Sequence, residues 1–179
     1  MIRFTDEEFY VRDAVLSDIP LYAQMLRSEE WMLNSGFNID EFREDDQIRN
    51  FLAKEHPDDI RWLVFHDEKG FLGFINFKII SDEYAITIGG IVTKYLNSGI
   101  GIKLIIECIN LYFTLGYKRK LRHNILQENL RSCKMHWGIG DKLVGLKFFG
   151  NHKYDVYETD KNLFYTSLLA KRFLNNNHN

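Results

Sequence analysis

The chain has 179 residues, a length that fits one ordinary domain. Hydrophobic residues make up 45% and aromatic residues 15% of it, which is enough apolar surface for a closed core and excludes a chain that is disordered throughout. The formal net charge is −2, so the composition does not favour nucleic acid as a partner. The one dense basic cluster, residues 118–122, is expected to be a solvated strand edge.

No stretch of the sequence predicts secretion or a membrane span. The first residues are charged and contain no continuous apolar run, and the longest apolar stretch, near residues 100–115, is interrupted by polar residues. Cys108 and Cys133 have no metal-ligand spacing and are expected to be free, buried thiols. We therefore expect a cytoplasmic protein without a metal site.

In chain order, the first half predicts strands, helices and a hairpin. A strand is expected over residues 9–14, followed by a helix that Ser17 caps. Residues 29–44 follow no regular pattern and predict a loop, and a second helix is expected over residues 45–55. Three strand-like runs come next, at residues 61–66, 71–80 and 83–92.

The second half contains the clearest helix, over residues 99–116. Its polar residues form one narrow stripe and its other faces are apolar, so it is predicted to pack against a sheet. The Gly89-Gly90 pair before it indicates a bulge or the close approach of another backbone or a ligand. The remaining predictions are a strand at 119–127, a helix at 130–137 and two final strands at 144–149 and 163–169. This order predicts an α/β domain with a mixed sheet.

A loop with two glycines opens the long helix. Glycines let a backbone approach a ligand closely, and the start of a helix offers unpaired amides and the positive end of its dipole. These features predict a pyrophosphate cradle that needs no basic side chain. The pattern fits neither a dinucleotide motif nor a P-loop, and alone it also fits relief of crowding at a helix start. The predicted cradle residues are Asn97, Ser98, Gly99, Ile100, Gly101 and Ile102.

A second motif follows the strand at 119–127. Asn129, Ser132 and Gly140 lie at steps of three and eleven, and together with Gly99 and Gly101 they make the sequence resemble the GNAT acetyltransferase superfamily over nearly its full length. Two positions depart from the family pattern. Leu96 stands where the family has Arg or Gln, and His136 stands where it has a catalytic Tyr.

The resemblance implies a single GNAT domain over residues 1–179, with a mostly antiparallel sheet of about seven strands and about four helices. It implies acetyl-CoA as cofactor, contacted by Asn129 and Ser132, and direct attack of an amine on a thioester that the amides of Ile91 and Val92 polarise. His136 is the candidate acid for the departing thiolate, with a packing role as the alternative.

No general base stands out in the sequence. Glu83 and His123 are candidates, and surface or core positions are the alternatives for both.

In this superfamily the acceptor pocket is built from the first two helices and their connection. The expected acceptor residues are Arg27, Glu30, Trp31, Met32 and Asn34. Mixed aromatic and polar residues suit a sugar ring, and the segment resembles acetyltransferases that act on nucleotide-linked amino sugars in pseudaminic acid synthesis. A loop folded onto the core is the alternative.

Three functions remain open at this stage. They are acetylation of a nucleotide-linked amino sugar for surface glycans, acetylation of a protein N-terminus, and acetyl-CoA binding without catalysis. The expected partner is a small-molecule amine, and the protein is expected to be a monomer or a homodimer. Four aromatic residues are candidates either for a dimer surface or for the core: Tyr154, Tyr157, Phe164 and Tyr165.

Overall fold

The computed structural model describes residues 2–5 and 9–175. It divides into two compact units, one made of Met1–Lys78 with Ile88–Gly101 and the other of Ile79–Thr87 with Ile102–Asn179. Among the described residues, none of the helices has both the length and the apolar character that crossing a bilayer requires. The two units are described in turn.

The strands of the first unit form a meander. Four of them pair in sequence order, antiparallel from each to the next, and the end of a fifth lies beside the fourth. Six of the seven residues of the third strand are buried, which marks it as a central strand. The strands are β1 (Ile2–Thr5), β2 (Phe9–Asp13), β3 (Ile60–His66), β4 (Gly70–Ile79) and β5 (Tyr84–Ile91).

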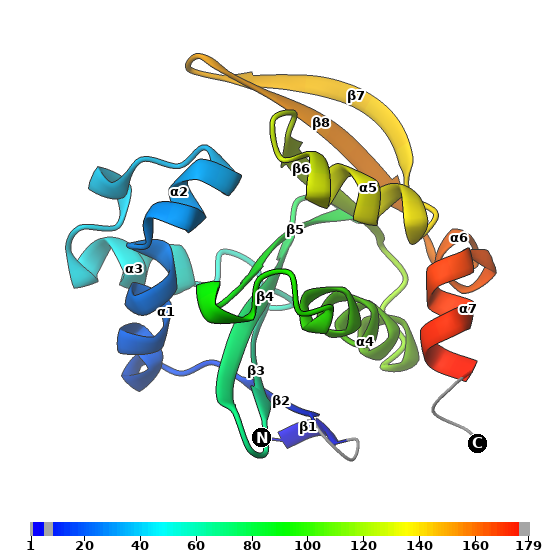
Figure 1. Cartoon of the computed structure of the whole chain (residues 1–179), viewed down its shortest axis with the longest axis horizontal. Coiled ribbons are helices and arrows are strands. Elements are labelled where there is room, and N and C mark those ends of the chain that lie inside the picture. Colours follow the sequence, from blue (N-terminus) through cyan, green and yellow to red (C-terminus); the bar gives the residue numbers. More distant parts are fainter. Residues whose placement is uncertain (1, 6–8, 176–179) are drawn as a thin grey trace. The chain divides into compact units, whose positions relative to one another are not determined.

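Short helices fill the connections of this unit, and Figure 1 shows the three α-helices grouped together in blue and cyan. Ser17 is not a cap: the turn before the first α-helix is held by Asp18, whose carboxylate accepts from Arg12 at 2.6 Å and from the Val15 amide at 2.8 Å. The helices are η1 (Leu16–Asp18), α1 (Ile19–Leu26), α2 (Glu29–Ser35), η2 (Ile39–Glu41), α3 (Asp45–Leu52) and η3 (Thr93–Tyr95).

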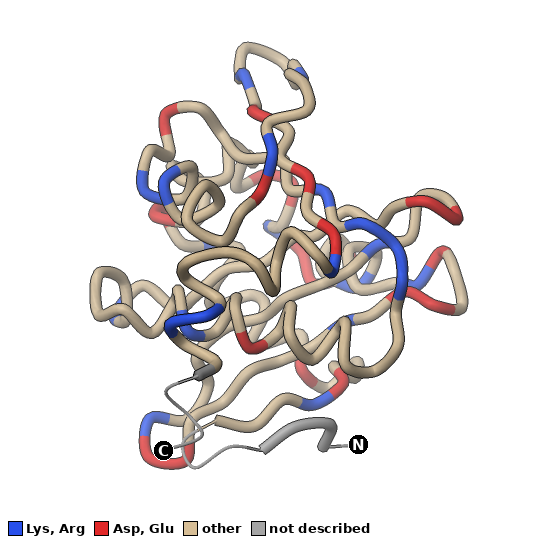
Figure 2. Tube along the Cα trace, turned by 90° about the vertical axis from the view of Figure 1, so that its right-hand side faces the viewer, with Lys and Arg blue, Asp and Glu red and all other residues tan. Residues whose placement is uncertain are grey.

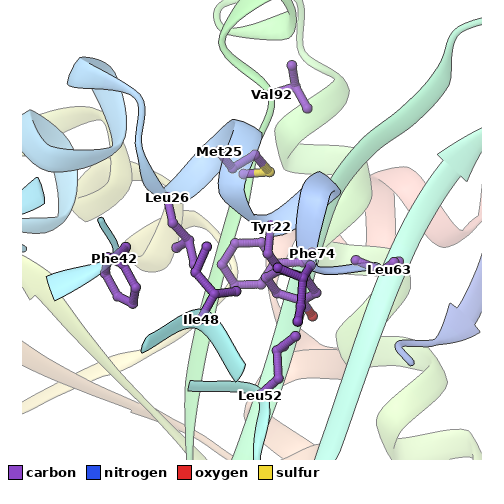
Figure 3. Close-up of a cluster of buried hydrophobic side chains, with 10 residues drawn as sticks. Tyr22, Met25, Leu26, Phe42, Ile48, Leu52, Leu63, Phe74 and Val92 are labelled. Carbon is purple, nitrogen blue, oxygen red and sulfur yellow. The ribbon is translucent and has the colours of Figure 1, made fainter. Parts of the chain in front are cut away.

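The core of the first unit forms where α1 and α3 meet β3 and β4. In Figure 3 the Tyr22 and Phe74 rings lie against each other, and their centroids are 4.7 Å apart. The Tyr22 hydroxyl donates to the side-chain oxygen of Asn76 at 3.1 Å, so the buried ring also satisfies its polar atom. This cluster fixes α1 against β4.

The second unit begins with the first half of β5. Residues 84–87 of β5 pair in parallel with 120–123 of β6, which in turn pairs antiparallel with β8, and β8 with β7. The strands are β6 (Lys120–Leu126), β7 (Lys142–Phe149) and β8 (His152–Thr159). The helices are α4 (Ile100–Thr114), α5 (Leu130–Gly138), α6 (Lys161–Thr166) and α7 (Leu168–Asn175).

The expected mixed, mostly antiparallel sheet is confirmed, with eight strands in the described residues in the order β1-β2-β3-β4-β5-β6-β8-β7. Two element predictions were wrong. Residues 29–44 contain α2, because Ser28 caps the Trp31 amide and Gly36 ends the helix with a φ of 74°. The last predicted strand is α6 and α7, because Asp160 caps α6 by accepting from the Leu163 amide at 2.8 Å.

The final aromatic residues belong mainly to the core of the second unit. Tyr154, Tyr157 and Phe164 are buried, and the Tyr165 hydroxyl donates to Asn110 of α4 at 2.8 Å. The core alternative therefore holds for these side chains.

Charges of both signs are spread over the trace in Figure 2. Two residues of the basic run at 118–122 form ion pairs with the same carboxylate. Lys120 lies 3.0 Å and Arg122 lies 2.8 Å from the oxygens of Glu158, and the Arg122 guanidinium also stacks on the Tyr84 ring at 3.9 Å. The run is thus partly neutralised within its own unit.

Candidate functional site

The backbones of β4 and β5 approach each other unusually closely at their glycines. A methyl group built on Gly73 would lie 2.1 Å from the carbonyl oxygen of Gly90, and one on Gly89 would lie 2.9 Å from that of Phe74. These positions therefore admit only glycine without a shift of the backbone. The close approach predicted for Gly89-Gly90 is confirmed, and the approaching backbone is β4.

The side of Gly90 on which a side chain would project is covered by Trp31 of α2. A methyl group on Gly90 would lie 2.5 Å from Cζ3 of Trp31 and 3.1 Å from the terminal carbon of Met25. The Trp31 ring is stacked on Phe37 with an interplanar angle of 6°, and its Nε1 is buried without a hydrogen-bond partner among the described residues. The six-membered ring of the indole thus packs against the end of β5.

Glu30 lies beside the same strand end. Its carboxylate accepts from the Thr93 hydroxyl at 3.4 Å, and its side chain is half-buried. The sequence did not indicate Thr93 as its partner, because sixty-three residues separate the two in the chain. An aromatic plane and a carboxylate therefore border the backbone that follows Gly90, an environment suited to a cationic amine.

The other expected acceptor residues are used differently. Arg27 donates to the Phe42 carbonyl and to Asp45, both at 2.7 Å, and so ties α1 to α3. The Asn34 amide donates to the Glu30 carbonyl at 2.6 Å within α2, and Met32 lies half-buried on the same helix. The structure thus brings Glu30 and Trp31 to the end of β5, whereas it places Arg27 and Asn34 in helix contacts.

An open depression of about 380 Å³ lies beside Arg27. Two arginines and three carboxylates line it, so it has no positive excess for a phosphate group. The lining residues are Arg27, Arg43, Glu44, Asp45 and Asp46.

The loop that opens α4 has the geometry of an anion cradle. Asn97 and Gly99 take the left-handed conformation, with φ of 66° and 83°, and both are exposed together with Ser98. The Ser98 hydroxyl donates to the Tyr95 carbonyl at 2.6 Å and accepts from the Ile100 amide at 3.3 Å, which fixes the turn. The next amides of α4, including those of Gly101 and Ile102, have no acceptor within the helix.

The two amides expected to polarise a thioester differ in this structure. The Val92 amide donates to the Leu72 carbonyl at 2.8 Å, so it belongs to the strand pairing and the expectation for Val92 is corrected. Ile91 remains the candidate, and its side chain is half-buried beside Gly101.

The loop geometry predicts different effects for its two glycines. Gly99→Ala places a side chain at a φ of 83°, which costs about 1 kcal/mol, and should weaken acetyl-CoA binding about fivefold by depopulating the turn. Gly101→Ala is the matched control, because its added methyl group meets only Ile91 carbons at 3.6 and 3.7 Å. Titration calorimetry measures both. Equal affinities for the two variants would contradict a cradle that depends on the Gly99 turn.

In the second unit, Asn129 is the N-cap of α5. Its side-chain oxygen accepts from the Ser132 amide at 3.1 Å, while the Ser132 side chain is half-buried. The three-residue step from Asn129 to Ser132 in the sequence is therefore explained by a helix cap. Both residues remain proposed cofactor contacts.

His136 lies in a buried cluster with His123 of β6 and Asp141, just before β7. Its Nδ1 is 2.6 Å from Oδ2 of Asp141, the same oxygen is 3.5 Å from Nε2 of His123, and the two imidazole centroids are 4.4 Å apart. Both histidine side chains are 2% exposed. The sequence missed this cluster, because Asp141 lies in no motif.

Burial controls the charges of this cluster. It lowers the pKa of His136 to about 3, lowers that of His123 to about 3 with help from the neighbouring His136, and raises that of Asp141 to about 6. At neutral pH a neutral His136 therefore donates from Nδ1 to the Asp141 carboxylate. This arrangement supports the packing alternative for His136 over its expected role as the catalytic acid.

The two candidate bases differ in their burial. Glu83 is exposed just before β5, and His123 belongs to the buried cluster.

The cluster also supplies the donor types of a metal site. The distance of 2.6 Å between Nδ1 of His136 and Oδ2 of Asp141 is a hydrogen-bond length. Two ligand atoms of one tetrahedral ion stand about 3.3 Å apart, so the two side chains are spaced for a hydrogen bond and not for a shared ion.

Replacing His136 tests its role. His136→Phe removes the donor to a buried carboxylate and should lower the free energy of unfolding by about 1–3 kcal/mol at pH 7, measured by urea denaturation. Trp137→Phe, at the exposed neighbouring position, is the control and should leave stability unchanged. A hundredfold loss of turnover with unchanged stability would instead establish His136 as the catalytic acid.

The cluster also predicts a pH dependence of stability. Unfolded histidines gain protons below pH 6.5, whereas folded His123 and His136 stay neutral down to about 3, so stability falls as the pH drops below 6.5. Asp141 acts oppositely between about 6 and 3.8, since its folded carboxyl binds the proton first. The destabilisation from the two histidines exceeds the stabilisation from the one aspartate, so the free energy of unfolding should fall between pH 7 and 5. This loss of stability should be smaller in His136→Phe, which has one buried histidine fewer. Urea midpoints at pH 7 and 5 measure it; equal losses in both proteins would contradict the assignment.

Comparison with known proteins gives a family match. The sequence profile described as the acetyltransferase (GNAT) domain matches residues 9–140. Direct sequence comparison with curated proteins finds no match.

The fold resembles solved structures at low sequence identity. The spermidine N-acetyltransferase from Vibrio cholerae, in complex with coenzyme A and spermine, is 15% identical with a TM-score of 0.77, over 90% of this chain and 100% of that one. The ribosomal-protein-S5-alanine acetyltransferase from Vibrio fischeri is 13% identical with a TM-score of 0.73, over 92% and 98%. An aminoglycoside acetyltransferase in complex with coenzyme A is 14% identical with a TM-score of 0.70, over 87% and 96%.

Proposed function

The chain belongs to the acetyltransferase (GNAT) domain family, and we propose that it acetylates the amine of an amino sugar. Membership makes it an N-acetyltransferase that uses acetyl-CoA. The family match over residues 9–140 takes in parts of both units, which supports treating residues 1–179 as one acetyltransferase domain.

The observation that carries the acceptor proposal is the position of Trp31 and Glu30 at the end of β5. In the family this strand end is where the thioester is placed, so an acceptor here would rest on the indole and offer its amine next to the Glu30 carboxylate. Flat apolar surface beside a hydrogen-bonding group is what a sugar ring with an amino substituent requires. Arg27 adds no support for a nucleotide carrier, because it is paired with Asp45.

The proposed reaction is direct transfer. The free amine attacks the thioester carbon, the new N–C bond forms, and the C–S bond breaks after the amine loses its proton. Backbone amides at Gly99–Ile102 hold the pyrophosphate, and the Ile91 amide is the candidate donor to the carbonyl oxygen. The leaving thiolate takes up a proton. The buried His136 is not assigned to that step.

A panel of amines tests the proposal. Thiol release from acetyl-CoA is measured with nucleotide-linked amino sugars, free amino sugars, polyamines and short peptides, and mass spectrometry locates the acetyl group. The highest kcat/KM is expected with an amino sugar. A preference for peptides would overturn this in favour of an N-terminal acetyltransferase, for which the acidic Glu29 and Glu30 are suited. Acetyl-CoA binding without turnover on any amine would favour the non-catalytic reading, which Leu96 and the buried His136 suggest.

Glu30 can be tested separately from the identity of the acceptor. Glu30→Gln removes the charge that would hold an ammonium or accept from an amine, and should lower kcat/KM for the best amine of the panel about 10–100-fold through KM. Glu29→Gln is the matched control, because Glu29 is exposed in the same turn of α2. Acetyl-CoA affinity should be the same in both variants. Equal kcat/KM in the two variants would remove Glu30 from the acceptor site.

A further inference from the structure

Strand β7 carries a row of large apolar side chains that the rest of the described chain leaves exposed. Within its unit, β7 comes last in the order β6-β8-β7 and pairs with β8. Figure 1 shows the two as a long orange hairpin whose tip extends beyond α5 of the same unit. The exposed residues of β7, with the exposed fraction of each, are Leu143 (55%), Val144 (49%), Leu146 (57%), Phe148 (64%) and Phe149 (57%).

These side chains lie on both faces of the strand. Phe148 is paired with Lys153, and the next residue, Phe149, is paired with His152, so the two rings point to opposite faces of the hairpin. A flat partner surface covers only one face of a strand, and a further strand added at the edge covers neither. A fluid medium that surrounds the outer strand covers both faces at once.

The hairpin is also the basic part of an acidic chain. Residues 142–153 contain three lysines and no acid. Since the formal net charge of the whole chain is −2, the remaining residues carry −5. The exposed apolar row is therefore accompanied by positive charge, and this combination favours a partner with a negatively charged surface over an apolar core.

The carboxylates nearest to these lysines are already used within the unit. Lys142 is paired in register with Glu158, but the oxygens of Glu158 bind Lys120 at 3.0 Å and Arg122 at 2.8 Å. Asp155, the first acid of β8, accepts from two other side chains at 2.6 and 3.3 Å. The positive charge of the hairpin is thus available to a partner.

We propose that the β7–β8 hairpin binds the surface of an anionic lipid bilayer, with β7 lying edge-on in the headgroup region. Apolar side chains of both faces then enter about 5–10 Å into the boundary with the acyl chains, as those of interfacial amphipathic segments do. Residues 143–149 extend for about 20 Å along the surface at the rise of a β-strand.

The edge-on position also suits the polar groups of the strand. The free backbone edge of β7 stays in the hydrated headgroup layer, where water and lipid phosphates satisfy its amides, so no unpaired backbone group reaches the hydrocarbon. The lysine ammonium groups lie at the level of the lipid phosphates. The contact involves only the second unit and does not depend on the acceptor proposed at Glu30 and Trp31.

The first test measures binding to vesicles. The wild-type chain should co-sediment with phosphatidylcholine vesicles that contain phosphatidylserine, and high salt should release it. Each lysine near an anionic surface strengthens binding about fivefold, so affinity for vesicles of phosphatidylcholine alone should be about 100-fold lower. The absence of binding to the anionic vesicles would overturn the proposal.

The apolar contribution is tested with Leu146→Ser/Phe148→Ser. Both side chains are exposed, so the circular dichroism spectrum and the urea midpoint should stay unchanged, while affinity for the anionic vesicles should fall about tenfold or more. Leu168→Ser is the matched control, because Leu168 is 79% exposed on α7, and it should bind as the wild type does. Equal losses in the two variants would contradict a contact made by β7.

The basic contribution is tested with Lys147→Gln/Lys153→Gln. At about fivefold for each lysine, this variant should bind the anionic vesicles about 25-fold more weakly. Lys161→Gln/Lys171→Gln removes the same charge from exposed positions on α6 and α7, and should lose less than half of its affinity. Equal affinities for the two double variants would show that net charge alone drives binding and would contradict the proposal.

A final test asks whether both faces enter the bilayer. Cys108 and Cys133 are buried, so Phe148→Cys and Phe149→Cys each add one accessible thiol for an environment-sensitive fluorophore. Both labels should shift to the blue on anionic vesicles, whereas a label at Leu168→Cys should not. A shift at only one of the two positions would contradict the edge-on arrangement. A shift that grows with protein concentration in the absence of vesicles would assign the strand to a second copy of the chain and overturn the proposal.

Discussion

The contact between β4 and β5 at Gly73 and Gly90 is the constraint on which the first unit depends. The two backbones come so close that a methyl group at Gly73 would fall 2.1 Å from a carbonyl oxygen. With no side chain on Gly90, the indole of Trp31 reaches the strand, and α2 takes its position from that contact. These two glycines therefore determine where the proposed acceptor residues lie, although neither of them has a functional group.

Features whose cause is local were predictable from the sequence. The cradle loop and α4 follow from Gly99, from the helix start and from an apolar pattern over fifteen residues. Short elements were not predictable in this way. In α2 and α6 the decisive signals are single caps, Ser28 and Asp160, and an apolar run such as that at residues 163–169 fits strand and helix equally well.

The chemistry of the site was predictable only to the level of residue types. His136 was identified by its position in a motif, but its burial and its pairing with Asp141 come from tertiary packing, which leaves no periodic trace in the chain. Arg27 was expected at the acceptor from its place beside the connection of the first two helices, and the structure pairs its guanidinium with Asp45 of α3. An exposed apolar strand such as β7 is likewise indistinguishable in sequence from a core strand. The pattern of apolar residues along a strand predicts which faces are apolar, but it does not tell whether those faces are covered by the rest of the chain.

The path of β5 has a consequence for how the chain acquires its structure. The strand passes from the second unit into the first at residues 87 and 88, and α4 passes back at residues 101 and 102, so each unit is made of two separate pieces of chain. During synthesis, the first unit cannot close until residue 101 has left the ribosome, after part of the second has already emerged. No single cut in the chain leaves both units intact. Each unit depends on long-range closure, which favours slow, coupled folding of the whole chain.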